Sequence, residues 1–154
     1  MSEQKILVEA IKDGTVIDHI PAGHGLTILR LFKLGQLGHR VTVGFNLSSH
    51  NNVGKDLIKV ENIHFSDEQA NKLALLAPKA TVNVIENYTV VKKHQLELPD
   101  SIESVFSCPN SNCASHTEPV NSFFYVKKRN SETKLKCKYC EKAFSQDIMT
   151  ESQT

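Results

Sequence analysis

The sequence predicts an α+β fold in two parts, a larger antiparallel sheet with two helices and a smaller all-β domain built around four cysteines. Two observations predict the first part. Short runs of alternating or β-branched apolar residues indicate strands, and two segments between them carry apolar residues at helical spacing. The second part is predicted by the cysteines, which fall in two close pairs near the C-terminus.

Composition excludes several classes of protein. Among the 154 residues, 40% are hydrophobic and 23% are charged, which is typical of a globular protein. The net charge of +1 gives no overall attraction to nucleic acid or membrane. No apolar stretch approaches the roughly 20 residues of a membrane span, and the N-terminus does not resemble a leader peptide. We therefore expect a cytoplasmic protein whose thiols stay reduced.

Six segments have the apolar pattern of strands: residues 5–9, 15–20, 40–47, 57–63, 81–85 and 88–91. The first helix is predicted from Leu26, Leu29 and Phe32, which recur at helical spacing, and Gly35 is placed to end it.

The second helix is predicted from a capping box, in which Ser66 is followed three residues later by Gln69. An apolar stripe of Ala70, Leu73, Ala74 and Ala77 follows, and Pro78 is expected to stop the helix.

The order strand, helix, strand, strand, helix, strand over residues 16–91 is the split βαβ pattern. It predicts a ferredoxin-like sandwich, with both helices on one face of an antiparallel sheet. Residues 5–12 would add an edge strand or pair with another subunit, and the pattern does not choose between these.

Residues 92–101 lose the periodicity, carry charge and contain Pro99, which indicates a linker. We place the domain boundary within it, giving domains at residues 1–97 and 98–154. The second is too short to fold by apolar burial alone, so a metal is expected to stabilise it.

The cysteine spacing is Cys108-x4-Cys113, then 23 residues, then Cys137-x2-Cys140. Two such pairs predict one tetrahedral zinc ion, and four thiolates leave no open position, so the site should be structural. The alternatives are free buried thiols or a redox pair at Cys137 and Cys140. His116 could compete as a ligand, but we expect it to be an exposed loop residue.

Residues 122–128 and 133–137 have strand patterns and would make this domain zinc-ribbon-like. The segment 123–142 holds seven Lys or Arg against two Glu, beside Phe123, Phe124 and Tyr125. This composition would suit nucleic acid, but the aromatics can equally form the small core. Because the rest of the chain is balanced in charge, we expect no nucleic-acid partner.

The sequence gives little support for an enzymatic activity of this chain. The sequence has no phosphate-binding loop, dinucleotide fingerprint, zinc-protease motif or nucleophile elbow. Asp18 and His19 could form a general-base pair, although a polar pair at a strand end is commoner. We expect a binding or regulatory protein and not an enzyme.

Five segments of the sequence resemble those of a known protein family. They are GTVIDHIPAG at 14–23, KDLIKVEN at 55–62, ATVNVIENYTVV at 80–91, CPNSNC at 108–113 and KCKYCEK at 136–142. In this order and spacing the chain resembles the regulatory chain of bacterial aspartate carbamoyltransferase, over nearly its whole length.

The resemblance implies a noncatalytic allosteric subunit of an enzyme of pyrimidine biosynthesis. Its N-terminal domain would bind nucleotides, with ATP activating, CTP inhibiting and UTP assisting CTP, and its zinc domain would bind catalytic chains. The implied assembly is two catalytic trimers joined by three regulatory dimers, with the dimer contact between N-terminal domains. No membrane partner is implied.

Matching positions assign the nucleotide pocket to Glu9, Ala10, Ile11, Val16, Asp18, His19, Leu57, Lys59, Asn83, Ile85, Tyr88, Val90 and Lys93. In this assignment Ala10, Ile11 and Ile85 read the base through backbone groups, Asp18 and Lys59 bond the ribose, and Lys93, joined by His19, neutralises phosphate.

This chain departs from the resemblance in having Gln95 where related chains carry an Arg two residues beyond the lysine. Lys92 and His94 lie nearby in the sequence and could compensate for that cation. In the zinc domain, the positions implied at the catalytic-chain contact are Asn110, Asn112, Lys138 and Glu141.

Overall fold

A computed structural model of the chain describes residues 10–48 and 53–146. It confirms the predicted α+β class, with antiparallel sheets in both parts and only short helices. The first part contains β1 (Gly14–Pro21), α1 (Gly25–Leu31), the 3-10 turn Leu34–Gln36, β2 (Val41–Leu47), β3 (Lys55–Glu61), α2 (Asp67–Leu73), β4 (Thr81–Glu86) and β5 (Thr89–His94). The second contains β6 (Ser101–Glu103), the 3-10 turn Ala114–His116, β7 (Phe123–Arg129), β8 (Glu132–Cys137) and β9 (Ala143–Ser145).

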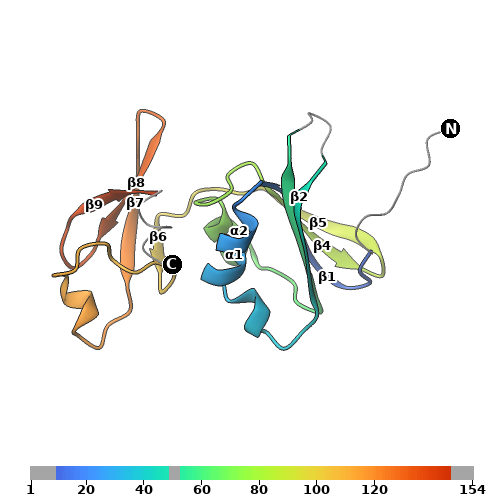
Figure 1. The fold of residues 1–154 in the computed structure, drawn as a ribbon, viewed down its shortest axis with the longest axis horizontal. Coiled ribbons are helices and arrows are strands. Elements are labelled where there is room, and N and C mark those ends of the chain that lie inside the picture. Colours follow the sequence, from blue (N-terminus) through green and yellow to red (C-terminus); the bar gives the residue numbers. More distant parts are fainter. Residues whose placement is uncertain (1–9, 49–52, 147–154) are drawn as a thin grey trace.

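The larger sheet has the strand order β2-β3-β1-β4-β5. Its first four strands, with α1 and α2, have the predicted split βαβ arrangement, and β5 is added at the edge. Figure 1 shows both helices on one face of this sheet, between the sheet and the smaller lobe. The opposite face of the sheet therefore points away from the cysteine-bearing part of the chain.

The pleat of the sheet separates the side chains of neighbouring residues onto these two faces. Ile17 pairs directly with Ile58 and with Val82, and all three side chains are fully buried under the helices. Val16, one residue earlier, pairs with Lys59 and Asn83 on the other face. We call the face that carries Val16 the open face.

Helix α1 differs from its prediction by one position. Its buried residues are Gly25, Ile28 and Leu31, whereas Leu26 is 44% exposed. The cause is Gly25, because a Cβ there would lie 2.8 Å from the side chain of Asp56, and only glycine lets the helix approach β3 so closely. The left-handed residue after the helix is Lys33, with φ of 52°, and not Gly35.

Helix α2 begins as predicted. The Ser66 hydroxyl accepts a hydrogen bond from the Gln69 amide, and the Gln69 side chain accepts one from the Ser66 amide. The predicted apolar stripe is buried, but the helix ends at Leu73, before Pro78. After Leu73 the chain tightens into turns with i to i−3 hydrogen bonds, such as that from the Leu76 amide to the Leu73 carbonyl.

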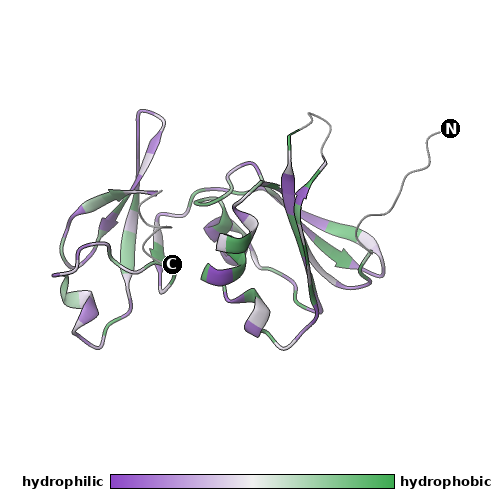
Figure 2. Ribbon diagram, in the orientation of Figure 1, coloured by the Kyte–Doolittle hydropathy of each residue, from purple (hydrophilic) through white to green (hydrophobic). Residues whose placement is uncertain are grey.

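The smaller sheet has the order β6-β7-β8-β9. Its buried side chains, including Ile102, Phe106 and Phe124, belong to the same contact cluster as the core beneath α1 and α2. Figure 2 shows that the exposed tip between β7 and β8 is largely hydrophilic. The core therefore extends from one part of the chain into the other.

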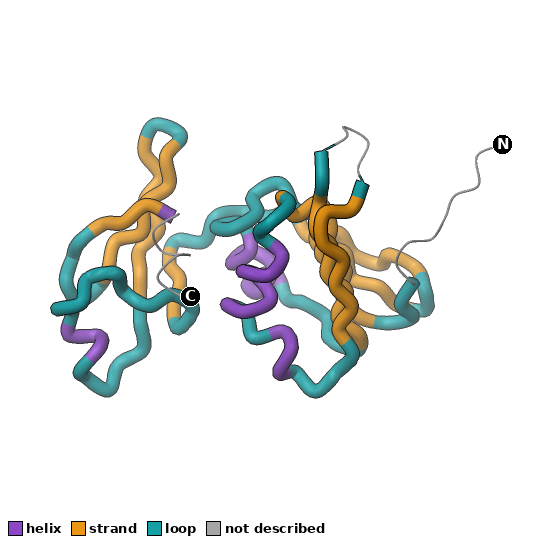
Figure 3. Tube along the Cα trace, in the orientation of Figure 1, coloured by secondary structure: helices purple, strands orange, loops and turns teal. Residues whose placement is uncertain are grey.

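The observed strand boundaries correct further predictions made from the sequence. The linker is shorter than predicted, because β5 includes residues 92–94 and β6 begins at Ser101 (Figure 3). Residues 10–12 form no strand, and the rest of the candidate segment 5–12 lies outside the described residues. Neither helix of the described chain has the length and apolar character needed to cross a membrane.

Asp56 ties the elements of the first part together. Its carboxylate is fully buried and accepts three backbone hydrogen bonds, from Gly23 at 3.0 Å, Gly25 at 2.8 Å and Asn46 at 2.8 Å. One side chain thus joins β3 to the start of α1 and to β2.

We predict that Asp56→Ala lowers the free energy of unfolding by about 3 kcal/mol, because it leaves several buried amides without acceptors. Asp56→Asn, which keeps one acceptor oxygen, should cost less. Urea denaturation of both variants measures the difference, and equal stability of Asp56→Ala and the unaltered chain would contradict this role.

Candidate functional site

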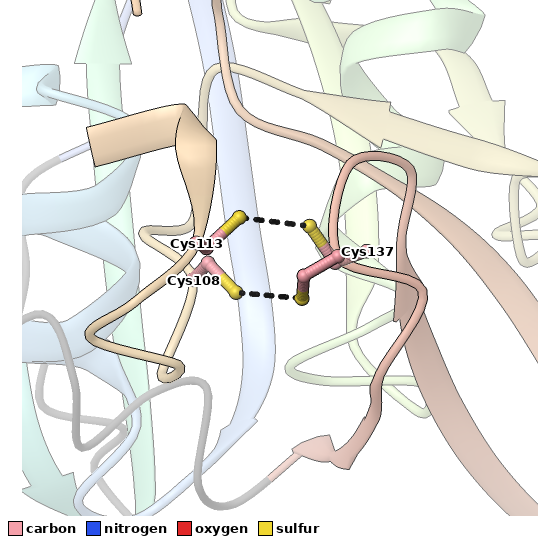
Figure 4. A group of neighbouring side chains, drawn as sticks. Cys108, Cys113 and Cys137 are labelled. Atoms are coloured by element: carbon pink, nitrogen blue, oxygen red, sulfur yellow. Dashed lines mark hydrogen bonds between the residues drawn. The ribbon is translucent and has the colours of Figure 1, made fainter. Parts of the chain in front are cut away.

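The four cysteines of the smaller part converge on one point. Figure 4 shows the side chains of Cys108 and Cys113 on one loop facing that of Cys137, the last residue of β8. The Sγ atoms of Cys108 and Cys140 lie 3.7 Å apart, those of Cys113 and Cys137 lie 3.6 Å apart, and all four lie within 4.8 Å of one another. The cluster is therefore positioned to bind one metal ion.

This geometry can be compared with that of a metal–thiolate centre. Zinc–sulfur bonds of about 2.3 Å in a tetrahedron place the sulfur atoms about 3.8 Å apart. The distances of 3.7 Å and 3.6 Å match this spacing. These contacts join cysteines of different pairs, Cys108 with Cys140 and Cys113 with Cys137. This is expected when the two cysteine-bearing loops, here called knuckles, share one ion, and not when Cys137 and Cys140 form a redox pair.

The environment of the sulfurs favours thiolates at two positions. Burial raises the pKa of Cys113, but hydrogen bonds from the hydroxyl and amide of Ser115 and from neighbouring thiols outweigh it and lower the pKa to about 6. The pKa of Cys140 is also lowered, because the amide of Lys142 and the side chain of Asn110 outweigh its burial.

Burial raises the pKa of the other two thiols, Cys108 and Cys137. Each close pair thus combines one cysteine of raised pKa with one of lowered pKa. A metal that binds all four as thiolates must displace the remaining protons, so its binding releases protons.

His116 is not part of the cluster. Its Nε2 lies 2.9 Å from the carbonyl oxygen of Cys108 and 3.0 Å from that of Asn110, so the ring donates to the backbone of the first knuckle. The residue is exposed, as expected, and it supports the loop that holds two of the sulfurs.

The open face of the larger sheet brings together many of the predicted nucleotide residues. Lys59 pairs with Val16, Val16 with Asn83, and Asn83 with Lys93, so four strands place these side chains in one row. Three strand spacings separate the two lysines, or about 14 Å along the row. Ile85, Val90 and Leu57 lie on the same face in neighbouring rows.

Asn83 carries an unusual feature within this row. Its Oδ1 atom is buried and has no hydrogen-bond partner among the described residues. Leaving a buried amide oxygen unpaired costs about 1–3 kcal/mol, so such atoms are uncommon unless a ligand or water satisfies them. The row therefore combines two cations with an acceptor suited to a polar ligand.

A small hollow at one end of the open face contains three further predicted residues. Ala10, Ile11 and Tyr88 line it together with Lys12, Arg40, Thr42 and Glu61, and its volume is about 120 Å³. Ligand pockets usually measure about 300–1,000 Å³, so this hollow could hold only one end of a nucleotide. Glu9 lies outside the described residues.

The structure adds residues that the sequence did not single out. Arg40 and Glu61 form an ion pair of 3.3 Å in the hollow, and Lys55 pairs with Asp18 at 2.9 Å. These are single charged residues near strand ends, and only the register of the sheet brings them to the site. No pattern in one sequence could have found them.

Asp18 and His19 do not form a catalytic pair. The Asp18 carboxylate accepts from the His19 amide at 2.7 Å and from Lys55, while the His19 ring lies 3.2 Å from the Thr81 hydroxyl. His19 has a φ of 57° at an irregularity of β1, which explains why two consecutive residues reach the same region.

Lys92 and His94 cannot replace the cation missing at Gln95. Lys92 pairs with Val84 and His94 with Val82, so both side chains belong to the helix-covered face, opposite to Lys93. Both also contact the carboxylate of Asp67, at 3.1 Å and 2.8 Å. The expectation failed because alternation along a strand sends neighbouring side chains in opposite directions.

The predicted contact residues of the smaller part surround the cysteines. Asn110 accepts from the amide of Asn112 at 3.1 Å, Glu141 has a left-handed φ of 63°, and Lys138 lies over the ring of Phe123 at 5.0 Å. All four residues are at least partly exposed and are held by the two knuckles.

Comparison with known proteins identifies the family. Residues 6–97 match the family described as aspartate carbamoyltransferase regulatory chain, allosteric domain, and residues 100–150 match that described as aspartate carbamoyltransferase regulatory chain, metal binding domain. The chain belongs to the aspartate carbamoyltransferase regulatory chains. The predicted resemblance is thereby confirmed.

Individual relatives agree over nearly full length. The regulatory chain of Chromobacterium violaceum is 68% identical over 144 residues, covering 94% of this chain and 95% of its own. That of Aeromonas hydrophila is 60% identical over 152 residues, covering 98% and 99%. That of Neisseria gonorrhoeae is 58% identical over 152 residues, covering 99% and 100%.

Membership shows a noncatalytic regulatory subunit that has an allosteric domain and a metal-binding domain. The four cysteines all lie within the second match, at residues 100–150. The prediction that the chain is not an enzyme is confirmed by the family, and the metal-binding part coincides with the cluster.

We predict that Cys113→Ser removes the bound metal and unfolds most of the smaller part, since a domain of this size depends on metal for its folding energy. Native mass spectrometry should show one metal ion in the unaltered chain and none in the variant. Ser111→Ala, at an exposed position between Cys108 and Cys113, serves as a control on the same loop. Retention of a stoichiometric ion by Cys113→Ser would contradict the four-thiolate site.

Proposed function

We propose that the chain is the nucleotide-responsive subunit of a cytoplasmic aspartate carbamoyltransferase and thereby controls pyrimidine biosynthesis. Residues 1–97 form the effector domain, which binds ATP, CTP and UTP on the open face. Residues 98–154 form a zinc domain that binds catalytic chains. The observation that carries the nucleotide part is the row of Lys59, Val16, Asn83 and Lys93 across four strands.

A nucleotide suits this face for three reasons. Lys59 and Lys93 offer positive charge at the two ends of the row, and Lys93 is exposed, so phosphate can reach it as a point charge. The unpaired Asn83 oxygen needs a donor, which a base or ribose supplies. The hollow beside Tyr88 has room for one end of the ligand.

The proposed effector residues are therefore those of the sequence assignment, with the base toward Ala10, Ile11 and Ile85 and the phosphates toward Lys93. Asp18 enters this site together with Lys55, its ion-pair partner. Gln95 is exposed and leaves Lys93 without a second cation from Lys92 or His94. We accordingly place most of the phosphate interaction on Lys93.

We predict that Lys93→Ala weakens CTP binding about tenfold, because a charge-assisted contact to phosphate is lost. Isothermal titration of the zinc-loaded full chain with CTP measures the change. Lys92→Ala is the matched control, since it removes the same charge from the next residue but on the other face of the sheet. Its affinity should change less than twofold.

An equal loss of affinity in both variants would indicate only a general electrostatic effect and would contradict the assignment to the open face. Absence of CTP binding by the folded, unaltered chain would overturn the effector site as a whole.

The metal is proposed to be zinc, held by Cys108, Cys113, Cys137 and Cys140. The donor set supports this, because four thiolates at tetrahedral spacing suit zinc and leave no position for a reacting ligand. Zinc would supply folding energy and rigidity, while the chain's own residues make the partner contact. Asn110, Asn112, Lys138 and Glu141 are fixed by the knuckles for that purpose.

The β7–β8 hairpin adds a charged surface to this contact. Lys127, Lys128, Arg129, Lys134 and Lys136 form no ion pair among the described residues, and they line a hollow of about 670 Å³. Lys127 lies directly opposite Lys134, where like charges repel. An acidic surface on a catalytic chain would relieve this repulsion.

The effector domain is proposed to form the homodimer of an assembly of two catalytic trimers and three regulatory dimers. β2 is an edge strand, and Phe45 on it is 52% exposed. Phe45 and Leu26 line a mainly apolar hollow of about 510 Å³. An exposed edge next to apolar side chains is characteristic of a surface that pairs with another chain.

We predict that the chain no longer binds catalytic trimers after a chelator has removed its metal, because the knuckles that orient the contact residues no longer form. Analytical ultracentrifugation with purified trimers should show assembly only after zinc is restored. The double variant Lys127→Glu and Lys134→Glu should weaken assembly in zinc-loaded protein, whereas Lys79→Glu, in the effector domain, should not. Full assembly by the metal-free chain would contradict the proposal.

A further inference from the structure

The edge strand β5 carries the proposed phosphate residue but has few packing contacts of its own. Residues 89–93 of this strand are all exposed, and His94 is its only buried residue. The His94 side chain is just 1% exposed. His94 therefore supplies the buried packing of β5 against the helix-covered side of the domain, and the exposed Lys92 adds an ion pair with Asp67 at 3.1 Å.

Both nitrogens of that ring face acceptors. Nδ1 lies 2.8 Å from the Asp67 carboxylate at the start of α2, and Nε2 lies 2.9 Å from the Phe65 carbonyl oxygen. A carboxylate and a carbonyl can only accept, so both hydrogen bonds form only when both ring nitrogens carry protons. A neutral ring would turn a lone pair toward one of these oxygens in a buried place.

One of the two anchors is rigid. The Phe65 amide donates to the buried Thr15 hydroxyl at 3.0 Å, and that hydroxyl donates to the Ile63 carbonyl at 2.6 Å. The loop that holds the Phe65 carbonyl is thus fixed to the central strand β1. The contact between the His94 ring and the Phe65 carbonyl connects this fixed loop to β5.

The other anchor is charged at neutral pH. The pKa of Asp67 is lowered, chiefly by its hydrogen bond with Lys92 and then by that with His94. The carboxylate therefore stays ionised well below neutrality, and loss of the contact at higher pH must come from the ring. Nearby, His64 pairs with Glu86 at 3.9 Å, and Val82 beside His94 is apolar.

We propose that His94, as an imidazolium joined to Asp67 and Phe65, is a positioning residue for the effector site and links proton uptake to nucleotide binding. The alternation of side chains along β5 explains how His94 positions Lys93. His94 and Lys93 are consecutive, so fixing His94 on the helix-covered face holds Lys93 on the open face. The functional consequence rests on the proposed nucleotide site, whereas the anchoring of β5 does not.

Loss of one proton from the His94 ring then weakens the attachment of β5 to the rest of the domain. A neutral ring loses one of its two hydrogen bonds, so the strand and Lys93 become less well fixed and a nucleotide must order them on binding. We expect the dissociation constant for CTP to rise about fivefold as His94 becomes neutral, the effect of one hydrogen bond.

The test compares the unaltered full chain with His94→Gln, whose amide is neutral at every pH and can still donate a hydrogen bond. CTP affinity is measured by titration calorimetry at several pH values across the range in which a histidine side chain changes from charged to neutral. The charge of CTP also changes with pH, but it does so equally in the titrations of both proteins. The difference between the two profiles therefore reports His94.

A matched pair of variants isolates the acidic anchor. Asp67→Asn removes the charge that His94 contacts, and Glu68→Gln removes a charge from the same turn of α2 at the neighbouring exposed position. Only the first should reduce the pH dependence. Identical pH profiles of the unaltered chain and His94→Gln would overturn the linkage.

Hydrogen exchange of the nucleotide-free chain separates this inference from the proposed function. After correction for intrinsic exchange, the β5 amides of the unaltered chain should lose protection as pH rises, and those of His94→Gln should not. Loss of protection without any CTP binding would contradict the nucleotide site but support the anchor. Unchanged protection with normal CTP binding would contradict the anchor alone.

Discussion

The alternation of side chains along an antiparallel strand is the constraint on which the arrangement of this protein depends. A slip of one residue in the pairing of β1 would exchange Val16 with Ile17 and turn the core outward. The burial of Ile17, Ile58 and Val82 beneath the helices fixes the register. The same register aligns the open-face row, so the packing of the core determines the proposed ligand surface.

The smaller part depends on a different interaction. Of its described strands only β7 and β8 are longer than three residues, and few large side chains are buried there, so the convergence of four sulfurs must supply much of its order. Its core nevertheless continues into that of the larger part. Because α1 and α2 lie between the open face and the smaller lobe, two routes join the proposed nucleotide surface to the metal-binding part: the helical layer and the chain between β5 and β6 (Figure 1).

Local sequence rules succeeded where the responsible contacts are local. The capping box at Ser66 and Gln69 involves residues three apart and was found directly. The buried face of α1 was misjudged because the helix is positioned by Asp56, which is 31 residues away from Gly25 in the chain. The roles of Lys92 and His94 were also misjudged, since the partner that orients both is Asp67, on a different element.

The sequence by itself determined the class of fold, the strand and helix order, the four metal-binding cysteines and the family, because each rests on periodicity, spacing or residue identity along the chain. Only the tertiary structure decided which neighbours share a face, that Asp18 pairs with Lys55, that Asn83 has an unpaired oxygen and that His94 is buried. These features arise from strand register and packing between distant segments. They depend on the pairing of residues far apart in the chain, which no local pattern encodes.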